Sequence, residues 1–177
     1  MKIFVWLALV SSIAILCLGW IWGNFAFSDP VFAFLVNWIL MSWVAVCGQI
    51  TPLPLLPEFY YAEKTFENTG QIYEAFGIHI FKNIVRRPPF TLLSPTLKFP
   101  ADKTDSSLQV LKTEMKKAET GHLLVFLLVS GLIGYALLNR QFMAAIWLFL
   151  FNALVNGYPV VLQRYNRIKL RNIKISR

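Results

Sequence analysis

Residues 3–27 read IFVWLALVSSIAILCLGWIWGNFAF, and residues 31–50 read VFAFLVNWILMSWVAVCGQI. Neither stretch contains a charged residue. A helix that crosses the hydrocarbon of a bilayer needs about 20 mostly apolar residues, because each residue rises about 1.5 Å across a core of roughly 30 Å. Each stretch meets that length, so we predict two transmembrane helices near the start of the chain.

Two further charge-free runs follow, at about 122–138 and 142–162. The third run is short by itself, but Leu108, Leu111 and Met115 recur before it at spacings of three and four, which is typical of one helix face. We therefore expect one long helix from about Ser106 to Leu138. The predicted fold class is all-α: a polytopic membrane protein with about four transmembrane helices, residues 1–177 forming a single membrane domain. Residues 52–121 form a cytoplasmic, interfacial insert between the second and third helices.

Composition supports lipid as the solvent. The chain is 56% hydrophobic and only 15% charged, against about 25% charged residues in an ordinary soluble domain. A cleaved signal peptide at the start is disfavoured, because the first apolar run is about twice the usual signal length and lacks a small-x-small cleavage site.

The basic residues predict the topology. The link after the first helix has no Lys or Arg and the link after the third has only Arg140, whereas the insert and the C-terminal tail are rich in both. By the positive-inside rule, both termini and the insert are expected to lie in the cytoplasm. The net charge of +8 then indicates contact with anionic membrane lipids. No nucleic-acid motif accompanies it, so no nucleic-acid partner is expected, and the sequence sets no oligomeric state.

Part of the insert has the pattern of a helix lying on a membrane surface. Residues 78, 80, 81, 84 and 85 are apolar, and Lys82, Arg86 and Arg87 lie among them, as in interfacial amphipathic helices. The alternative is that this segment packs on the insert's own helices without touching lipid.

Glu119 and His122 are three residues apart on the predicted long helix, so their side chains lie within reach of each other. A carboxylate beside an imidazole orients the ring and raises its basicity, as general-base catalysis requires. The alternative is an interfacial histidine without chemistry. A di-iron site would need a second Glu-x-x-His and further carboxylates, which the chain lacks, so no metal is expected.

A polar stripe runs along the fourth span. Asn152, Asn156, Pro159 and Gln163 follow one another at spacings of four, three and four residues. Polar groups in hydrocarbon cost free energy unless paired, so the stripe is expected to face protein, water or a ligand head group. The alternative is that these amides only join helices. The stripe continues into Arg164, Tyr165, Asn166 and Arg167, whose two guanidinium groups suit a phosphate or carboxylate, or simply anchor the chain.

Three stretches resemble one known family. The stretch Asn156-Gly-Tyr-Pro-Val-Val-Leu-Gln-Arg-Tyr-Asn-Arg-Ile-Lys-Leu170 closely resembles the C-terminal signature of the glycosyl-diaponeurosporenoate acyltransferases. Phe66-Glu67-Asn-Thr-Gly70-Gln-Ile-Tyr73 and Ala118-Glu119-Thr-Gly-His122 resemble two further motifs of that family. The resemblance implies a small membrane enzyme of carotenoid biosynthesis that attaches a fatty acyl chain to a glycosylated terpenoid acid, and thus a lipid-linked glycoside (a glycolipid) as substrate.

We accordingly expect His122, oriented by Glu119, to be the general base. No cofactor is expected beyond an acyl-thioester co-substrate such as acyl-CoA. Another lipid head-group transferase and a non-enzymatic membrane interaction protein are the alternatives. The expected substrate-binding residues are Glu67, Asn152, Asn156, Gln163, Arg164, Tyr165, Asn166 and Arg167.

Overall fold

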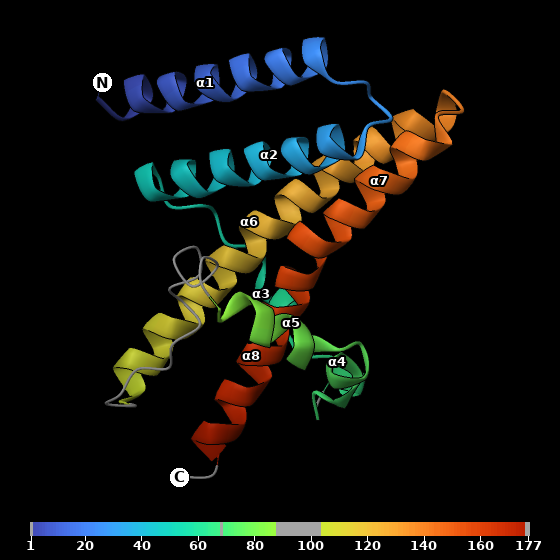
Figure 1. Cartoon of the computed structure of the whole chain (residues 1–177). Helices are drawn as coiled ribbons and strands as arrows, with labels where there is room; N and C mark the ends of the chain where they lie inside the picture. Colours follow the sequence, from blue (N-terminus) through green and yellow to red (C-terminus); the bar gives the residue numbers. More distant parts are fainter. Residues whose placement is uncertain (1, 68, 88–103, 176–177) are drawn as a thin grey trace. The chain divides into compact units, whose positions relative to one another are not determined.

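A computed structural model describes residues 2–67, 69–87 and 104–175 of the chain. All regular elements in these ranges are helical (Figure 1), which confirms the predicted all-α class. Four helical segments are long and apolar enough to cross a membrane: Lys2–Asn24, Pro30–Ile50, Asp105–Leu138 and Phe142–Arg171.

Contacts between residues divide the chain into two compact units. Unit 1 comprises Met1–Pro54 and Gly121–Gly157, and unit 2 comprises Leu55–Thr120 and Tyr158–Arg177. The single membrane domain expected from the sequence stays a prediction, and each unit is described by itself.

Unit 1 begins with α1 (Lys2–Asn24) and α2 (Pro30–Ile50), which lie side by side and antiparallel (Figure 1). α1 ends three residues before the predicted boundary at Phe27. The carboxylate of Asp29 accepts a hydrogen bond of 2.7 Å from the main-chain N–H of Val31, and Pro30 occupies the first turn. A side-chain cap followed by proline is a strong signal for a helix start, so α2 begins where the chain reverses.

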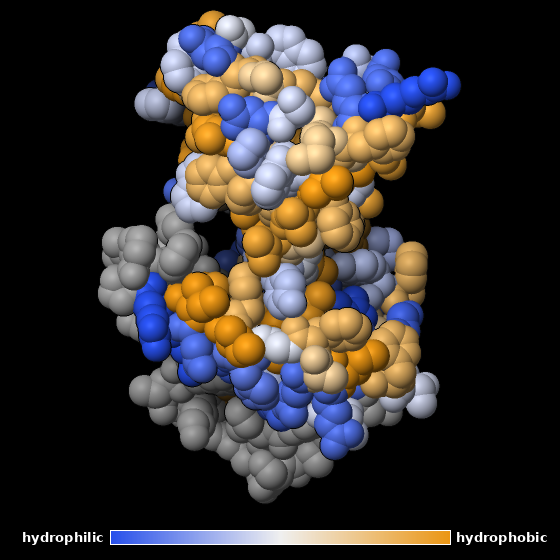
Figure 2. All heavy atoms as spheres, turned by 45° about the vertical axis from the view of Figure 1, so that its right-hand side comes forward, coloured by the Kyte–Doolittle hydropathy of each residue, from blue (hydrophilic) through white to orange (hydrophobic). Residues whose placement is uncertain are grey.

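The core of unit 1 forms where α2 packs against the second half of α6 (Asp105–Leu138) and against α7 (Phe142–Asn152). Gly121 permits close approach, because a Cβ atom there would lie 3.3 Å from Val44. Large apolar side chains of α1, among them Phe4, Leu16 and Trp20, point outward. Apolar side chains also cover much of the face drawn in Figure 2, as expected of a surface solvated by lipid. The buried core residues are Ala33, Val44, Val125, Val129 and Leu148.

The last predicted span is interrupted by a π-helix. α7 is followed by η4 (Ala153–Gly157) and then by α8 (Tyr158–Ile175). Proline has no N–H, so Pro159 cannot donate to the main-chain carbonyl of Val155. Such a gap in the ladder favours a π-bulge, a feature often found at functional sites. The sequence predicted a helix over 142–162 but neither its interruption nor its continuation to Ile175.

The described residues of unit 2 form four short elements: α3 (Glu58–Tyr61), the 3₁₀ turn η1 (Thr65–Glu67), α4 (Gln71–Ala75) and α5 (Ile78–Val85). The main chain reverses direction at Gly70 and Gly77, whose φ angles are +74° and +73°. Both values lie in the left-handed region that glycine adopts without strain. A 3₁₀ turn therefore precedes Gly70, and α4 follows it.

Two long helical segments of unit 2, the first half of α6 and α8, contact each other, and α8 also contacts the short helices (Figure 1). α5 and α4 lie on α8 through a cluster that includes Ile78 and Tyr165. The first half of α6 packs on α8 through Met115 and Leu170. α6 is continuous from Asp105 to Leu138, which confirms the predicted long helix. The two prolines after Arg87 favour a helix end there, but Pro88 and Pro89 lie outside the described residues.

Candidate functional site

Arg164 and Glu67 form a buried, two-pronged ion pair in unit 2. Arg164, on α8, donates from Nε to Oε1 of Glu67 over 2.9 Å and from Nη2 to Oε2 over 3.0 Å. Glu67 lies at the end of η1 and is 3% exposed. Its carboxylate also accepts from the main-chain N–H of Lys64 over 2.7 Å. Paired hydrogen bonds of this kind fix the geometry of the pair as well as stabilising it. They therefore hold η1 at one position along α8.

Glu119 joins the same cluster from α6. Its Oε2 lies 2.5 Å from Nη1 of Arg167, and its Oε1 lies 3.4 Å from Nη1 of Arg164. The Glu119 side chain is fully buried. Two glutamates and two arginines thus neutralise one another inside unit 2, which is the arrangement that makes buried charge tolerable.

Two tyrosines complete the surroundings of this cluster. The hydroxyl of Tyr73 donates to Oε1 of Glu67, and the carbonyl of Tyr60 accepts from Nη1 of Arg164 over 3.1 Å. Burial, and then the neighbouring Glu67, raise the pKa of Tyr73 to about 12. Burial, and then the charge of Glu119, raise the pKa of Tyr60 to about 12. Both phenols therefore remain protonated donors at neutral pH.

The pKa of Glu67 moves in the opposite direction. Burial alone would raise this pKa, but hydrogen bonds from Arg164, the main chain of Lys64 and Tyr73 together lower it to about 2. Glu67 is therefore an anion at neutral pH, which suits a structural partner of Arg164 better than a proton-transfer group.

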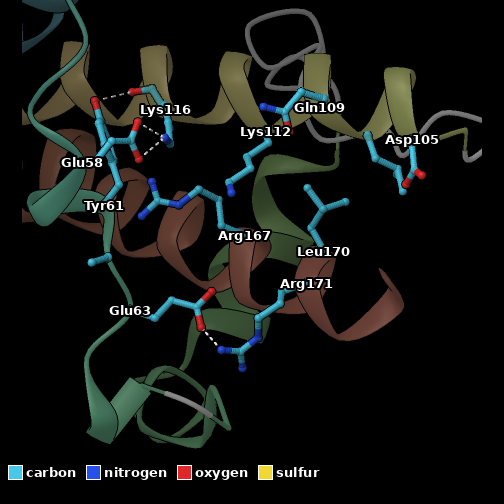
Figure 3. Close-up of a pocket in the computed structure, with 12 residues that line it drawn as sticks. Glu58, Tyr61, Glu63, Asp105, Gln109, Lys112, Lys116, Arg167, Leu170 and Arg171 are labelled. Carbon is cyan, nitrogen blue, oxygen red and sulfur yellow. Dashed lines mark hydrogen bonds and ion pairs between the residues drawn. The ribbon is translucent and has the colours of Figure 1, made fainter. Parts of the chain in front are cut away.

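A pocket of about 560 Å³ borders this cluster, with Arg167 in its wall (Figure 3). Two ion pairs lie in its lining. Lys116 donates to both carboxylate oxygens of Glu58 at 2.7 and 2.8 Å, and Arg171 pairs with Glu63. Lys112 makes no hydrogen bond or ion pair among the described residues. The lining residues are Glu58, Tyr61, Ala62, Glu63, Asp105, Leu108, Gln109, Lys112, Lys116, Arg167, Leu170 and Arg171.

Charges of both signs balance in this pocket. Once Arg167 is assigned to Glu119, the remaining cations Lys112, Lys116 and Arg171 face Glu58, Glu63 and Asp105. The wall also holds the ring of Tyr61, which stacks under Lys116 at 4.7 Å and under Arg167 at 5.0 Å. Such a lining offers donors, acceptors and apolar surface without a net charge, which suits a neutral polyhydroxylated group better than a polyanion.

The other predicted binding residues of unit 2 have internal partners or are deeply buried. The hydroxyl of Tyr165 donates to Glu74 over 2.9 Å, and the amide oxygen of Asn166 accepts from Lys82 over 3.5 Å. Gln163 is buried, and its Oε1 has no hydrogen bond among the described residues. These three side chains are placed to support α8, and none of them lines the pocket.

The amides of the polar stripe that belong to unit 1 join helices. Asn152 donates to the carbonyl of Phe126 on α6 over 3.0 Å. Asn156 donates to the amide oxygens of Asn37 on α2 over 2.8 Å and of Asn152 over 3.0 Å. The helix-joining alternative that the sequence left open therefore describes Asn152, while Asn156 retains one unused group.

His122 also lies in unit 1, next to that unused group. Along α6 it precedes Phe126 by one turn, and along η4 Asn156 follows Asn152 by one turn, so antiparallel packing brings His122 opposite Asn156. The ring interacts with the Asn156 amide and with the carbonyl of Val155. Its Nδ1 and the Oδ1 of Asn156 are both buried, and neither atom has a hydrogen-bond partner among the described residues. The partner expected for His122 was Glu119, whose carboxylate here engages Arg164 and Arg167.

Several residues of these sites were not singled out from the sequence. Glu58, Tyr61, Glu63, Lys112 and Lys116 line the pocket, and Asn37 completes the amide chain. Asn37 carried a usable signal, since it is an amide near the middle of a charge-free span and such groups need partners. The pocket residues carried none, because charged side chains in an insert are ordinarily solvated.

Within the part of the chain that the structure describes, no group of three or more His, Cys, Asp or Glu residues has a geometry that could hold a metal ion. Comparison with protein families gives one match: the model of the glycosyl-4,4'-diaponeurosporenoate acyltransferase family matches residues 57–174. No curated protein and no solved structure gives a significant match.

Proposed function

Because the chain belongs to the glycosyl-4,4'-diaponeurosporenoate acyltransferase family, we propose that it transfers a fatty acyl group to the sugar head of a glycosylated terpenoid lipid. One observation carries the proposal furthest. The three stretches that resemble the family are far apart in the sequence, yet each contributes to one buried cluster through Glu67, Glu119 and the pair Arg164 and Arg167. The cluster borders a pocket that is large enough for a sugar. The meeting of the three stretches beside this pocket supports a substrate-binding role for it.

The reaction is an acyl transfer from an acyl thioester such as acyl-CoA. A sugar hydroxyl oxygen attacks the thioester carbonyl carbon, and its proton passes to a general base. The tetrahedral intermediate then expels the thiolate, which takes up a proton, so the products are a sugar ester and a free thiol. The balance requires no redox partner.

The pocket of unit 2 is proposed to bind the sugar. Carboxylates of Glu58, Glu63 and Asp105 accept from hydroxyl groups, and Lys112 donates to them. The face of Tyr61 and the side chain of Leu170 suit the C–H faces of a sugar ring. This assigns sugar binding to residues of the pocket wall in place of Gln163 and Asn166.

Arg164, Glu67 and Glu119 are proposed to be positioning residues. Every nitrogen of the Arg164 guanidinium already has a protein acceptor, so a substrate phosphate would have to displace one. Arg167 differs, because it reaches both Glu119 and the pocket wall. Its guanidinium is the group of this cluster proposed to contact substrate.

His122 remains our proposed general base, with a changed partner. The ring interacts with the Val155 main chain and the Asn156 side chain, and we propose that these groups accept a proton from Nδ1 and leave Nε2 as the base. Asn156 and the carbonyl freed by Pro159 would thus take the orienting role first given to Glu119.

The location is proposed as integral to a bacterial cytoplasmic membrane, with both termini and the insert in the cytoplasm. The distribution of Lys and Arg in the sequence supports this orientation. An acyl thioester made in the cytoplasm would then meet a lipid-linked sugar at the inner leaflet.

The decisive experiment is an acyl-transfer assay with purified protein in nanodiscs. Radiolabelled acyl-CoA and a glycosylated terpenoid acid are supplied, and the ester is quantified by mass spectrometry. We expect His122→Ala to lower turnover by about 100- to 10,000-fold, while His79→Ala, the chain's other histidine, keeps near-normal turnover. No ester from wild-type protein with any glycolipid acceptor would overturn the proposed function.

The pocket is tested by filling it. Gln109→Trp places a bulky ring in the pocket wall from an exposed position of α6, and Val110→Trp places the same ring at the next, exposed position outside the pocket. The first variant is expected to raise the KM for the glycolipid by about tenfold, equivalent to ~1.4 kcal/mol, and the second to leave it unchanged. Equal KM values for the two variants would assign the sugar elsewhere.

A further inference from the structure

α5 presents two different faces, and only one of them is used by the fold. Ile78 is fully buried, and it packs with Phe81 against α8 through Leu162 and Tyr165. These contacts of Ile78 and Phe81 hold α5 against α8 (Figure 1). The alternative of packing on the insert's own helices therefore describes one face of α5, and the second face is left for a surface contact.

The second face is apolar and has no partner among the described residues. Ile80 is 69% exposed and Ile84, one turn later, is 49% exposed. Phe76, which ends the preceding α4, is 67% exposed. Ile80 lies close to the glycine turn that follows Phe76, since its Cδ1 is 3.9 Å from the Cβ position of Gly77. Three large apolar side chains are thus left open along one short element.

Positive charge accompanies this face. Arg86, the C-cap of α5, and Arg87, which follows it in the chain, are both exposed. Lys82 lies near two further cations: burial, and then the charges of Arg86 and Lys169, lower its pKa. The carboxylate found in this region, Glu74, already contacts Tyr165, Lys169 and His79. The local field is therefore positive beside an open apolar stripe.

We propose that α5 docks on the surface of an anionic bilayer, with Phe76, Ile80 and Ile84 entering the acyl-chain boundary and Arg86 and Arg87 contacting lipid phosphates. Apolar anchors flanked by Arg are the pattern of helices that lie in the membrane interface. Charge complementarity selects lipid over a second copy of this chain, whose net charge of +8 would repel another. This docking does not depend on the acyl-transfer reaction.

Depth measurement with a nitroxide label tests the proposal. Cys17→Ser and Cys47→Ser remove both native thiols, and Ile80→Cys, Ile84→Cys or Asn83→Cys then carries the label. Asn83 is the matched control, because it is exposed on the same helix but lies toward the polar flank. Collision rates with oxygen, which concentrates in lipid, and with a water-soluble nickel chelate are measured in full-length protein in nanodiscs of phosphatidylglycerol and phosphatidylcholine.

Labels at 80 and 84 are expected to collide several-fold more often with oxygen than with nickel, and the label at 83 is expected to show the reverse. In nanodiscs of phosphatidylcholine alone, the preference at 80 and 84 should weaken, and Arg86→Gln with Arg87→Gln should remove this dependence on lipid charge. Labels at 80 and 84 that collide freely with nickel would overturn the proposal. Labels shielded from both reagents would indicate a protein partner and would overturn it equally.

Discussion

Glu119 and Arg167 face each other across α6 and α8, with Oε2 and Nη1 separated by 2.5 Å and both side chains buried. Their pairing joins two segments that are 48 positions apart in the sequence, and Arg164 adds a second contact to the same carboxylate at 3.4 Å. Four predictions follow from this cluster and its surroundings.

Removing the carboxylate should strongly destabilise the protein. Glu119→Gln leaves two buried guanidinium groups short of one negative charge, and breaking a buried pair in this way costs about 3–5 kcal/mol. Glu114→Gln is the control on the same helix, because its pair with Lys117 is half-exposed and such pairs are worth at most about 1 kcal/mol. Thermal unfolding in detergent measures both. A loss for Glu119→Gln no larger than that for Glu114→Gln would contradict the buried cluster.

Acid should weaken the Glu67 pair. The pKa of Glu67 is about 2 in the folded protein, below its ordinary value of 4.5, so the unfolded chain binds a proton first as the pH falls. The stabilisation, on the order of 3 kcal/mol, is complete well above pH 4.5 and is lost as the pH falls toward 2. Glu67→Gln should be less stable at pH 7 but show a flatter fall in melting temperature between pH 6 and pH 3. Parallel curves for the two proteins would refute this assignment.

The tautomer of His122 reports its partner. In a His79→Gln background, His122 is the single histidine, and ¹⁵N NMR should show the proton on Nδ1. Asn156→Leu removes one acceptor and should reduce the Nδ1–H population and lower turnover by roughly 10- to 100-fold, as loss of an orienting group commonly does. Asn37→Val disturbs the same amide chain without touching the ring and should leave the tautomer unchanged. A proton on Nε2 in the parent protein would rule out Asn156 as the orienting residue.

The turn at Gly70 should tolerate a side chain less well than the turn at Gly77. Both have φ near +74°, so an alanine costs about 1–2 kcal/mol at either position for backbone conformation. At Gly70 the new Cβ would also lie 3.3 Å from Cε2 of Tyr165, whereas at Gly77 the nearest atom is 3.9 Å away. Chemical denaturation should therefore show Gly70→Ala to be less stable than Gly77→Ala by roughly 1 kcal/mol. Equal losses would mean that the Tyr165 ring moves freely.

The helices were predictable because they depend on local properties of the chain. Length and hydropathy fix a span, and the predicted helix from Ser106 to Leu138 was confirmed to within one residue at its start. The π-helix at Ala153–Gly157 was not predicted, although Pro159 carried the signal. The sequence pattern places Pro159 in a polar stripe, but its missing N–H also leaves a gap in the main-chain hydrogen bonds of the helix.

The site was only partly predictable. The sequence predicted a site that includes Glu119 and the segment around Arg164 and Arg167, and the structure brings these side chains into one buried cluster. The sequence predicted that Glu119 orients His122, because spacing along one helix shows only which side chains of that helix are within reach of each other. Arginines from another helix compete for the same carboxylate, and no spacing rule includes them.

The sequence by itself therefore determined the four long apolar helices and the family, because hydropathy and helix periodicity are properties of neighbouring residues. Tertiary structure alone decided which carboxylate neutralises which arginine, which charges line the pocket and which face of α5 stays open. Those outcomes depend on side chains from distant segments meeting in a medium of low dielectric constant, where each buried charge must find a partner.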